Sequence, residues 1–567
     1  MIAPPQIIGR KNKSIFSHGV FLIFLCAALL RKIDDFDIWC HLSIGREIVS
    51  SYQIPKVELF VLPLLGQPVS YHEWGFGVLC YLTYHLMNYW GLSLLNALFG
   101  GGTLFLMYRA ARREETVSPA PLLVLGCLFW AIEYRFIYRP EMVLFFLLAA
   151  EIYLCERFIH EGNLNVLLPL PFFACLLSNF HPSSLFLMVV FGFYSLQFLQ
   201  ETQAGMKRSR LSLALLALLM CVFFGASLNP YGIRQVLLPL QFAMQSTMLQ
   251  GNVEFLPTFR TVYRWHYILL CAVAVISLCC APKRRLVDML LCSFFAWLGY
   301  RYVRNVALFA IVCYVPVSRT FSFYAENRGM RNALLRHIIL WVASLSVLSL
   351  MLVSPLVKGV WGAGFISDVL PVKSAEAITR MRPGGNVFNF YHMGGFLSWE
   401  LYPGYRVFID GRHYDLDRSL VLHNTVLSGD PKWGRILEEY GITMIVIPAT
   451  LPFSNKLIPL IPILAEDNMW NLVGREPGGL LFLRENARIE GDIARPLDKE
   501  EIWKQVISES RKTLQRDPNN AGSYYAIGEG YMMMGDYANA LEAFRNCLWL
   551  RPEDAAAKQM ISILQQH

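Results

Sequence analysis

The chain has 567 residues, of which 55% are hydrophobic and only 16% charged, with a formal net charge of +8. This composition is too apolar for an ordinary soluble protein. Basic loops between apolar runs account for the net charge, so no nucleic-acid partner is required. The 13 cysteines lie mostly inside the apolar runs and show no CxxC or Cys/His metal spacing, so no disulfide framework is predicted.

The apolar residues come in runs of about 16–22, the length needed to cross roughly 30 Å of hydrocarbon. We therefore expect a polytopic α-helical membrane protein with about eleven transmembrane helices. The predicted spans are 14–30, 92–108, 119–134, 141–156, 164–180, 183–199, 211–228, 266–281, 286–300, 305–318 and 337–357.

The stretch 74–90 is long enough to be a further span, and the basic residues decide its placement. If it crossed the membrane, every later basic loop would lie outside. If it lies along the outer surface as an interfacial helix, the basic loops all face the cytoplasm, as the positive-inside rule expects. We therefore predict a cytoplasmic N-terminus and place everything after about Leu356 outside the cytoplasm.

Changes in composition along the chain predict three regions. Residues 1–357 form the membrane domain, with an external loop at 31–91 that carries interfacial helices. Residues 358–490 form an external α/β domain, because short β-rich runs alternate there with helical patterns. Its strands are predicted at Asn386–Tyr391, Arg406–Asp410, Ile442–Pro448 and Gly479–Arg484, and its helices at Ser374–Met381, Ser419–Leu427 and Lys432–Tyr440.

Residues 500–567 are predicted to be helical and resemble the tetratricopeptide repeat family. Counting from Ala521, the signature positions of that repeat are occupied by Tyr524, Ile527, Gly528, Tyr531, Ala540, Phe544 and Pro552. Pro518 stands one period before Pro552. The segment is expected either to dock another protein or to cap the α/β domain.

With this topology, charged and polar residues gather at the outer ends of the spans. They are Asp34, Asp35, Asp37, His41, Glu73, Arg135, Arg139, Glu141, His181, Asn229, Glu254, Arg301 and Arg304. Charge near a bilayer is unfavourable unless it is paired or hydrated, so a ring of such residues indicates a polar cavity that opens outward. Ordinary loop charge and helix capping are the alternative for each residue taken singly.

The acidic residues directly after the first span are the most specific candidates for a catalytic or metal-binding site. In an extended segment Asp35 and Asp37 point the same way. Two carboxylates so placed suit a divalent cation such as Mg or Mn, or a metal-free base for an acceptor hydroxyl. His41 joins them on one face if the segment is helical, and a hydrated loop acid is the alternative for Asp37.

The stretch from Asp37 to His41, followed by Gly45-Arg46, resembles the acidic loop of the GT-C glycosyltransferases, the superfamily of oligosaccharyltransferase catalytic subunits and protein mannosyltransferases. The segment 391–411 is loosely similar to the soluble part of oligosaccharyltransferases, but reads YHMGG where they have WWDYG. The whole layout looks like bacterial multi-pass proteins that join such a membrane domain to tetratricopeptide repeats. Shared landmarks are Arg139-Pro140, the run 229–232 and the run 407–412.

The resemblance implies transfer of a sugar from a polyprenyl-phosphate carrier at the outer face of the bacterial inner membrane. Asp37 would then be the catalytic base or metal ligand, with Asp35 second. Arginines that hold phosphate bidentately would contact the lipid phosphate. The residues expected to bind substrate are His41, Glu73, Arg135, Arg139, His181, Arg301, Arg304, Asp410 and Arg412.

Two of these residues belong to the α/β domain. Asp410 and Arg412 follow a predicted strand, where they would contact an acceptor if the domain covers the membrane cavity. The alternative is a tight turn with a surface ion pair.

Two other functions remain open at this point. A non-enzymatic scaffold would recruit an envelope partner through the repeat segment. A polysaccharide polymerase, ligase or transporter would share the cavity and the arginines, but would not need an acidic cluster directly after the first span.

Overall fold

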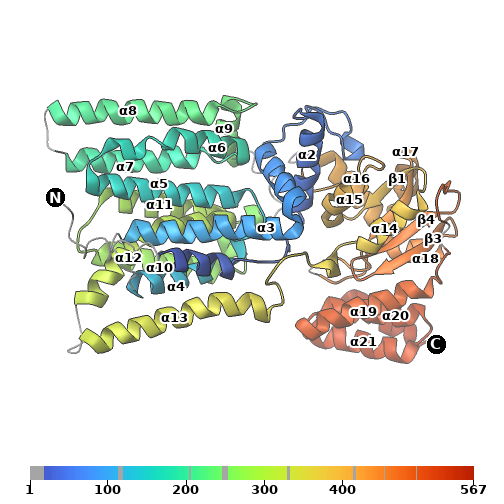
Figure 1. The fold of residues 1–567 in the computed structure, drawn as a ribbon. Coiled ribbons are helices and arrows are strands. Elements are labelled where there is room, and N and C mark those ends of the chain that lie inside the picture. The colour runs from blue at the N-terminus through green and yellow to red at the C-terminus, as the bar shows by residue number, and fades with distance from the viewer. Residues whose placement is uncertain are drawn as a thin grey trace. The chain divides into compact units, whose positions relative to one another are not determined.

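The structure is a computed structural model that describes residues 18–112, 119–202, 206–244, 253–327, 333–412, 417–452, 454–492 and 495–566. The first residues of the predicted span 14–30 therefore lie outside the described residues. The chain divides into two compact units (Figure 1). We call residues up to Asp35, Ile44–Tyr52 and Tyr71–Phe365 the helical unit, and Phe36–Ser43, Gln53–Ser70 and Ile366–His567 the sheet unit.

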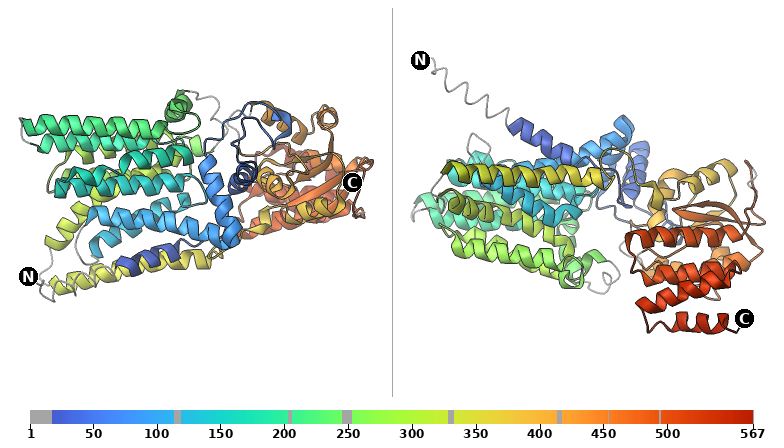
Figure 2. Two further views of the ribbon diagram at one scale, coloured as in Figure 1. Left: turned by 45° about the horizontal axis from the view of Figure 1, so that its top comes forward. Right: turned by 90° about the horizontal axis from the view of Figure 1, so that it is seen from below.

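Most long helices of the helical unit run roughly parallel or antiparallel to one another (Figures 1 and 2). The helices of this unit begin with one at His18–Ala28. The others are the end of α2 (Ile38–Ser51), α3 (Trp74–Ala111), α4 (Pro119–Ile132), α5 (Glu141–Glu161), α6 (Leu170–Phe180), α7 (Leu185–Glu201), α8 (Met206–Ser227), α9 (Ile233–Met244), α10 (Arg264–Cys280), α11 (Leu286–Arg301), α12 (Val306–Asn327) and α13 (Ala333–Val357). Single-turn helices lie at Glu133–Arg135 (η2), Leu164–Leu167 (η3), Val253–Phe255 (η4), Thr258–Arg260 (η5) and Val303–Asn305 (η6).

Among the described residues, four helices are long and apolar enough to cross a membrane: Trp74–Ala111, Lys207–Ser227, Val303–Ala325 and His337–Val357. Shorter apolar helices lie at His18–Ala28, Leu164–Phe180, Leu185–Glu201 and Arg264–Cys280. The total of about eleven spans therefore stays a prediction.

Helix α3 joins the stretch 74–90 to the predicted span 92–108. Its backbone leaves the helical conformation at Asn88, with φ 51° and ψ −143°. A Cβ at Gly91 would lie 2.5 Å from the carbonyl oxygen of Thr83, so only glycine permits this sharp bend. The break falls at the boundary predicted between the two segments.

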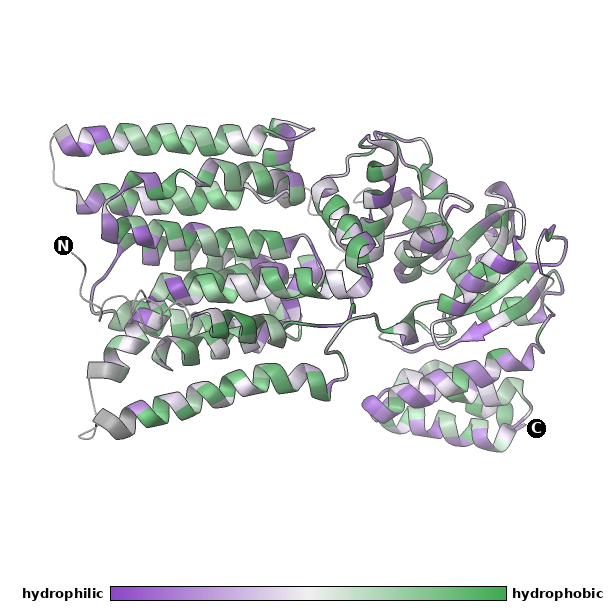
Figure 3. Ribbon diagram, viewed as in Figure 1, coloured by the Kyte–Doolittle hydropathy of each residue, from purple (hydrophilic) through white to green (hydrophobic). Residues whose placement is uncertain are grey.

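The helices differ in how deeply they are buried. Helix α12 packs against α4, α10 and α11, and 83% of its apolar 18-residue stretch is buried. In α8 and α13 only 28% and 22% of the corresponding stretch is buried, and leucines such as Leu213 and Leu345 are exposed. The hydrophobic colour runs along these outer helices (Figure 3). Exposed apolar faces of this length are expected where a helix meets lipid.

The sheet unit contains a four-stranded sheet with the order β1-β2-β4-β3. Strand β1 is parallel to β2, and the other two pairings are antiparallel. The strands are β1 (Asn386–Asn389), β2 (Ile442–Ile447), β3 (Trp470–Glu476) and β4 (Gly479–Arg484). The apolar run of β2 is buried along almost its whole length, as expected for a central strand.

Helices surround this sheet. They are α14 (Val372–Met381), α15 (Gly394–Leu401), α16 (Asp417–Leu427), α17 (Trp433–Glu439) and α18 (Leu460–Glu466), with single turns η1 (Leu62–Leu64), η7 (Ser367–Val369) and η8 (Tyr391–Met393). The three helices predicted here are confirmed as α14, α16 and α17, whereas β3, α15 and α18 were missed.

The strand predicted at Arg406–Asp410 is only partly formed. Val407 makes isolated bridges to Val61 and Val387, and no regular strand results. Buried Asn389 holds this segment instead, because its side-chain oxygen accepts from the backbone N–H of Phe408 at 2.8 Å and its amide donates to the carbonyl of Ile409 at 2.8 Å. Through Val61, the segment 53–70 pairs with this part of the chain. It was predicted as part of the membrane domain, but it belongs to the sheet unit.

The C-terminal part of the sheet unit is a stack of helices, α19 (Glu500–Arg516), α20 (Ala521–Met533), α21 (Tyr537–Leu550) and α22 (Ala555–Leu564). Asn520 and Asp536 cap α20 and α21 with their side chains. A Cβ at Gly528 would lie 2.6 Å from the ring of Phe544, so the glycine lets α20 and α21 approach closely. The helical character is confirmed, and the repeat assignment stays a prediction.

Candidate functional site

Charged residues at one end of the helical unit form a continuous network of ion pairs, which we call the rim network. Its members come from the chain after the first helix, from η2 and the segment that follows it, from the start of α5, and from the single turns η4 and η6. They are Asp35, Arg135, Arg139, Glu141, Glu254 and Arg304.

One half of the rim network is centred on Arg139. Its Nε donates a hydrogen bond of 2.6 Å to Oδ2 of Asp35, and its Nη1 donates to Oε1 of Glu254. The same oxygen of Glu254 accepts from Nη1 of Arg135 at 2.9 Å. Burial would raise the pKa of Glu254, but the charges of Arg135 and Arg139 outweigh burial and lower it.

The other half is centred on Glu141, the first residue of α5. Its two carboxylate oxygens accept from Arg135 and from Arg304. Three carboxylates thus alternate with three guanidinium groups, and the network is neutral as a whole. Charge-assisted pairs of this kind are stable in a buried setting only when each partner is satisfied.

The rim network is buried on one side and accessible on the other. The side chains of Asp35, Arg135 and Glu141 are only 3%, 4% and 8% exposed. Those of Arg139, Glu254 and Arg304 are 22–24% exposed. A ligand from solvent would therefore meet two guanidinium groups and one carboxylate.

His181, which ends α6, is buried in the same unit. Its Nε2 lies 3.9 Å from Oε1 of Glu73. Burial lowers the pKa of His181 to about 3, the charge of Glu141 opposes that shift, and the charges of Arg304 and Arg135 add to it. The imidazole is therefore neutral at neutral pH, and its contact with Glu73 is polar rather than ionic. Its Nδ1 is buried and has no hydrogen-bond partner among the described residues.

Arg301 does not join the rim network in the described part of the chain. Its side chain is exposed, and its guanidinium lies 5.8 Å from the ring centre of Tyr302. This position suits interfacial anchoring as well as it suits phosphate binding.

Asp37 and His41 belong to the sheet unit, while Asp35 belongs to the helical unit. The chain bends at Phe36 and turns at Asp37 into α2, so the extended conformation considered for the acidic segment is not found. His41 follows Asp37 by one helical turn, and its N–H donates to the carbonyl of Asp37 at 3.2 Å. Asp37 is partly exposed, and its Oδ1 would lie 2.8 Å from a Cβ at Gly411.

Asp410 and Arg412 form a buried pair inside the sheet unit. Nε of Arg412 donates to Oδ2 of Asp410 at 2.9 Å, and a second guanidinium nitrogen donates to Oγ of Ser398 at 2.8 Å. The guanidinium lies 3.8 Å from the ring centre of Phe60. Asp410 is fully buried and Arg412 is 5% exposed, so the pair holds this turn together rather than facing solvent. The surface ion pair considered as the alternative is buried instead.

The sequence analysis missed a second ion pair in the helical unit. Nη2 of Arg31 donates to Oε1 of Glu133 at 2.7 Å, and Nζ of Lys358 lies 3.6 Å from the same oxygen. A signal for it was present, since Arg31 directly follows the first predicted span and Glu133 falls at the end of another.

No group of three or more histidine, cysteine, aspartate or glutamate side chains suited to a metal ion occurs among the described residues. The carboxylate of Asp35 is occupied by Arg139. Shared metal binding by Asp35 and Asp37 therefore stays a prediction.

A comparison with solved structures finds an archaeal enzyme of similar fold. The oligosaccharyltransferase of Archaeoglobus fulgidus, crystallised with Zn and sulfate, matches with a TM-score of 0.54 and 10% sequence identity. The match covers 94% of this chain and 86% of that chain. At this identity the likeness shows a shared, GT-C-like fold. Together with the apolar helices, that fold fits a membrane protein.

No protein-family model matches the sequence, and a search of curated proteins finds no match.

Proposed function

We propose that the protein is a membrane glycosyltransferase of the GT-C kind. It would transfer a sugar from a polyprenyl-phosphate-linked donor to an acceptor outside the cytoplasm. The observation that carries the proposal is a buried acid of the loop after the first helix, Asp35, tied into a network whose accessible side presents Arg139 and Arg304. The GT-C-like fold supports the same reaction class.

The reaction needs a carboxylate for the acceptor's proton and cations for the departing phosphate. In this proposal the acceptor hydroxyl gives its proton to an aspartate, Asp37 or Asp35, as its oxygen bonds to the anomeric carbon of the sugar. The bond between that carbon and the phosphate oxygen breaks, and the electron pair leaves with the polyprenyl phosphate. Arg139 and Arg304, each partly exposed, would stabilise the charge that develops on the phosphate.

The arginines do not act as free cations in this proposal. Each already donates to a carboxylate, so a phosphate would have to share or replace Glu254 or Glu141 as the acceptor. Such an exchange is favourable only for a doubly charged or bidentate ligand, which gives the network selectivity for phosphate over neutral molecules. His181 is buried and neutral, and it lies close enough to Glu141 for the charge of that carboxylate to affect its pKa. It would supply a polar group to the site without adding charge.

The divalent cation predicted from the acidic loop has no three-ligand site among the described residues, so no step is assigned to it. The archaeal oligosaccharyltransferase was crystallised with Zn. A metal requirement is therefore tested directly, by comparing transfer before and after chelation with EDTA and after the return of Mg or Mn.

The deciding experiment uses the full-length protein reconstituted with a pool of polyprenyl-phosphate sugars and candidate acceptors. Three variants of the same loop are compared with the wild type: Asp35→Asn, Asp37→Asn and Asp34→Asn. Asp34 is exposed and serves as the matched control. Transfer that is lost in the Asp35 or Asp37 variant and kept in the Asp34 variant supports the proposal and identifies the base.

Equal transfer by all three variants would remove the acidic loop from catalysis. A wild type that transfers no sugar across many donors and acceptors would favour the non-enzymatic scaffold. Release of long glycan chains rather than single transfers would favour a polymerase or ligase.

A further inference from the structure

A groove runs between α19 and α20 in the C-terminal stack of helices. It has a volume of about 430 Å³, within the range of about 300–1,000 Å³ that is usual for ligand sites in proteins. Among the described residues, no carboxylate lines it. The residues that line it include Lys504, Ile507, Arg511, Lys512, Tyr531 and Met534. The groove is therefore both open and positively charged.

The polar wall of the groove is a single stripe along α19. Its members follow one another at intervals of three or four residues, so they lie on one face of the helix. They are Lys504, Ser508, Arg511 and Gln515, and all four side chains are exposed. With a rise of 1.5 Å per residue, the stripe is roughly 16 Å long.

Helix α19 is anchored to the sheet by a different face. Its buried residues include Ile502, Trp503 and Val506. The side-chain amide of Gln505 donates a hydrogen bond of 2.9 Å to the backbone carbonyl of Glu476 in β3. The helix is therefore held from one side, and the polar stripe is left accessible to solvent.

The floor of the groove is apolar. Ile507 is only 7% exposed, and a Cβ at Gly530 would lie 2.8 Å from its Cγ1. Because Gly530 has no side chain, α20 can approach α19 closely at this point. Met534 follows one helical turn later and lines the same groove. Methionine is flexible and polarizable, so it adapts to apolar side chains of different shapes.

Arg511 is held in place without losing its charge. Its Nη2 donates a hydrogen bond to the hydroxyl of Tyr531, and its guanidinium lies 5.8 Å from the centre of that ring. Tyr531 in turn packs against the core residues Ala540 and Phe544. A neutral hydroxyl does not cancel the charge of a guanidinium group, and the remaining N–H groups of Arg511 can still hold a carboxylate.

The cations of the groove differ in how far acids already neutralise them. Lys504 pairs with Glu501 at 2.9 Å. Neither Arg511 nor Lys512 forms an ion pair in the described part of the chain. Burial raises the pKa of Glu509 to about 7, and the charge of Lys512 only partly opposes that shift. Glu509 is therefore a weak counter-charge, and two positive charges lie uncompensated beside the apolar floor.

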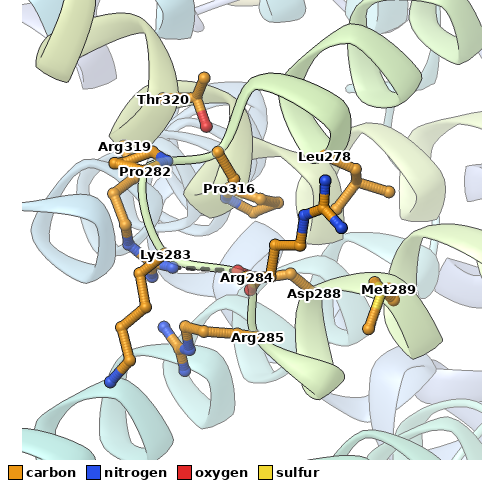
Figure 4. Close-up of a pocket in the computed structure, with 11 residues that line it drawn as sticks. Leu278, Pro282, Lys283, Arg284, Arg285, Asp288, Met289, Pro316, Arg319 and Thr320 are labelled. Atoms are coloured by element: carbon orange, nitrogen blue, oxygen red, sulfur yellow. Dashed lines mark hydrogen bonds and ion pairs between the residues drawn. The ribbon is translucent and has the colours of Figure 1, made fainter.

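The basic cluster at the turn between α10 and α11 lacks these features (Figure 4). There, Asp288 accepts a hydrogen bond of 3.0 Å from Nη1 of Arg319, and Glu156 accepts one of 3.0 Å from Nη1 of Arg285. The cavity beside them has a volume of only about 10 Å³, which is room for about one water molecule. Positive charge alone does not make a binding surface, whereas the groove on α19 combines it with space and an apolar floor.

We propose that the groove between α19 and α20 binds a peptide segment of a partner protein that carries acidic side chains beside apolar ones. Arg511 would hold one carboxylate and Lys512 a second, while the apolar side chains would lie on Ile507 and Met534. A stripe of roughly 16 Å matches about eleven residues of helix or about five of extended chain. The proposal goes beyond sugar transfer and does not depend on it.

The apolar floor favours a peptide over an acidic glycan. A glycan would contact the two uncompensated cations as well as a peptide does. It would leave Ile507 and Met534 without apolar partners, and burial of apolar surface is a main source of affinity in such grooves.

The test measures the binding of a rhodamine-labelled peptide to the full-length protein in detergent, by fluorescence anisotropy. In the peptide, glutamates alternate with leucines over eight residues. Arg511→Gln combined with Lys512→Gln should weaken binding about tenfold or more. The matched control combines Arg545→Gln with Lys558→Gln, which removes two exposed cations from α21 and α22. It should bind the peptide as the wild type does.

Two further probes separate the groove from surface charge. A peptide with serines in place of the leucines should bind severalfold more weakly, because it cannot use the apolar floor. Equal binding of the serine and leucine peptides would overturn the proposal. Tighter binding of an oligogalacturonate, an acidic glycan, than of the leucine peptide would also overturn it.

The proposal fails as well if the wild type does not bind the leucine peptide, or if the variant of Arg511 and Lys512 binds it unchanged. Circular dichroism checks that this variant melts as the wild type does. If it does not, Ser508→Glu decides the question, because it adds a negative charge to the stripe at an exposed position. Weaker binding by Ser508→Glu supports the groove, and unchanged binding overturns it.

Discussion

Nε of Arg139 donates a hydrogen bond of 2.6 Å to Oδ2 of Asp35, and so ties the segment before α5 to the chain that leaves the first helix. The two residues are 104 positions apart in the sequence. Their pairing brings an acid of the loop after the first helix into the rim network. It also means that the arginine a ligand would meet is already oriented by a buried acid.

Replacing Arg135 should destabilise the helical unit strongly. Arg135→Gln removes the cation between Glu254 and Glu141 and leaves Glu141 with a single arginine. Breaking a buried pair on one side costs about 3–5 kcal/mol of the free energy of unfolding. Chemical denaturation in detergent measures the change. Arg301→Gln, at an exposed position, should change stability by no more than about 0.5 kcal/mol. Similar losses in both variants would contradict the network.

Asp410 should prove to be a structural residue. Asp410→Asn keeps the shape of the side chain but leaves the guanidinium of Arg412 buried without its counter-charge. We expect a loss of about 3–5 kcal/mol in the stability of the sheet unit. The exposed Glu490→Gln is the control, with an expected change near zero. A stable Asp410→Asn protein with impaired sugar transfer would instead return Asp410 to the substrate-binding residues.

The stability of the protein should depend on pH through His181. Its pKa is lowered to about 3 by burial, whereas an unfolded histidine titrates near 6.5. Between these values the unfolded chain binds a proton that the folded chain does not. Stability is therefore lost as the pH falls below about 6.5, by at most roughly 1.4 kcal/mol per pH unit from this residue.

The contribution of His181 is isolated by comparing variants. His181→Gln should flatten the fall in stability between about pH 6.5 and pH 4, measured by chemical denaturation at each pH. His85→Gln, at an exposed position on α3, should keep the slope of the wild type. An unchanged slope in His181→Gln would show that the imidazole is not held neutral.

The contact between Gly528 and Phe544 should be intolerant of a side chain. Gly528→Val places methyl groups against the ring, and we expect a loss of about 1–3 kcal/mol in the stability of the C-terminal helices. Gly434→Ala, on the short helix α17 with open space around it, should be neutral or slightly stabilising. Thermal unfolding followed by circular dichroism distinguishes the two. Equal stability of both variants would exclude close packing of α20 on α21.

Much of the architecture was predictable because its signals are local. The apolar run of β2, the helical patterns of α14 and α17 and the boundary near Asn88 each depend on neighbouring residues. The positions of the rim residues followed from the order of the spans. Helix ends that share one face of a membrane bring their polar residues to one level, whatever their separation in sequence.

The pairing of those residues was not predictable. All six members of the rim network were candidates by position, but their partners lie up to 163 residues apart. The sequence also did not show that Asp35 and Asp37, which lie on either side of the bend at Phe36, belong to different units.

The sequence by itself determined that this is an apolar, many-helix chain with an α/β part and a helical end. Composition and periodicity act over a few turns, and a span or a buried strand needs nothing more distant to be specified. Which acid meets which arginine depended on the tertiary structure. Charges pair over a few ångströms in space, and only the packing of helices distant in sequence brings them that close.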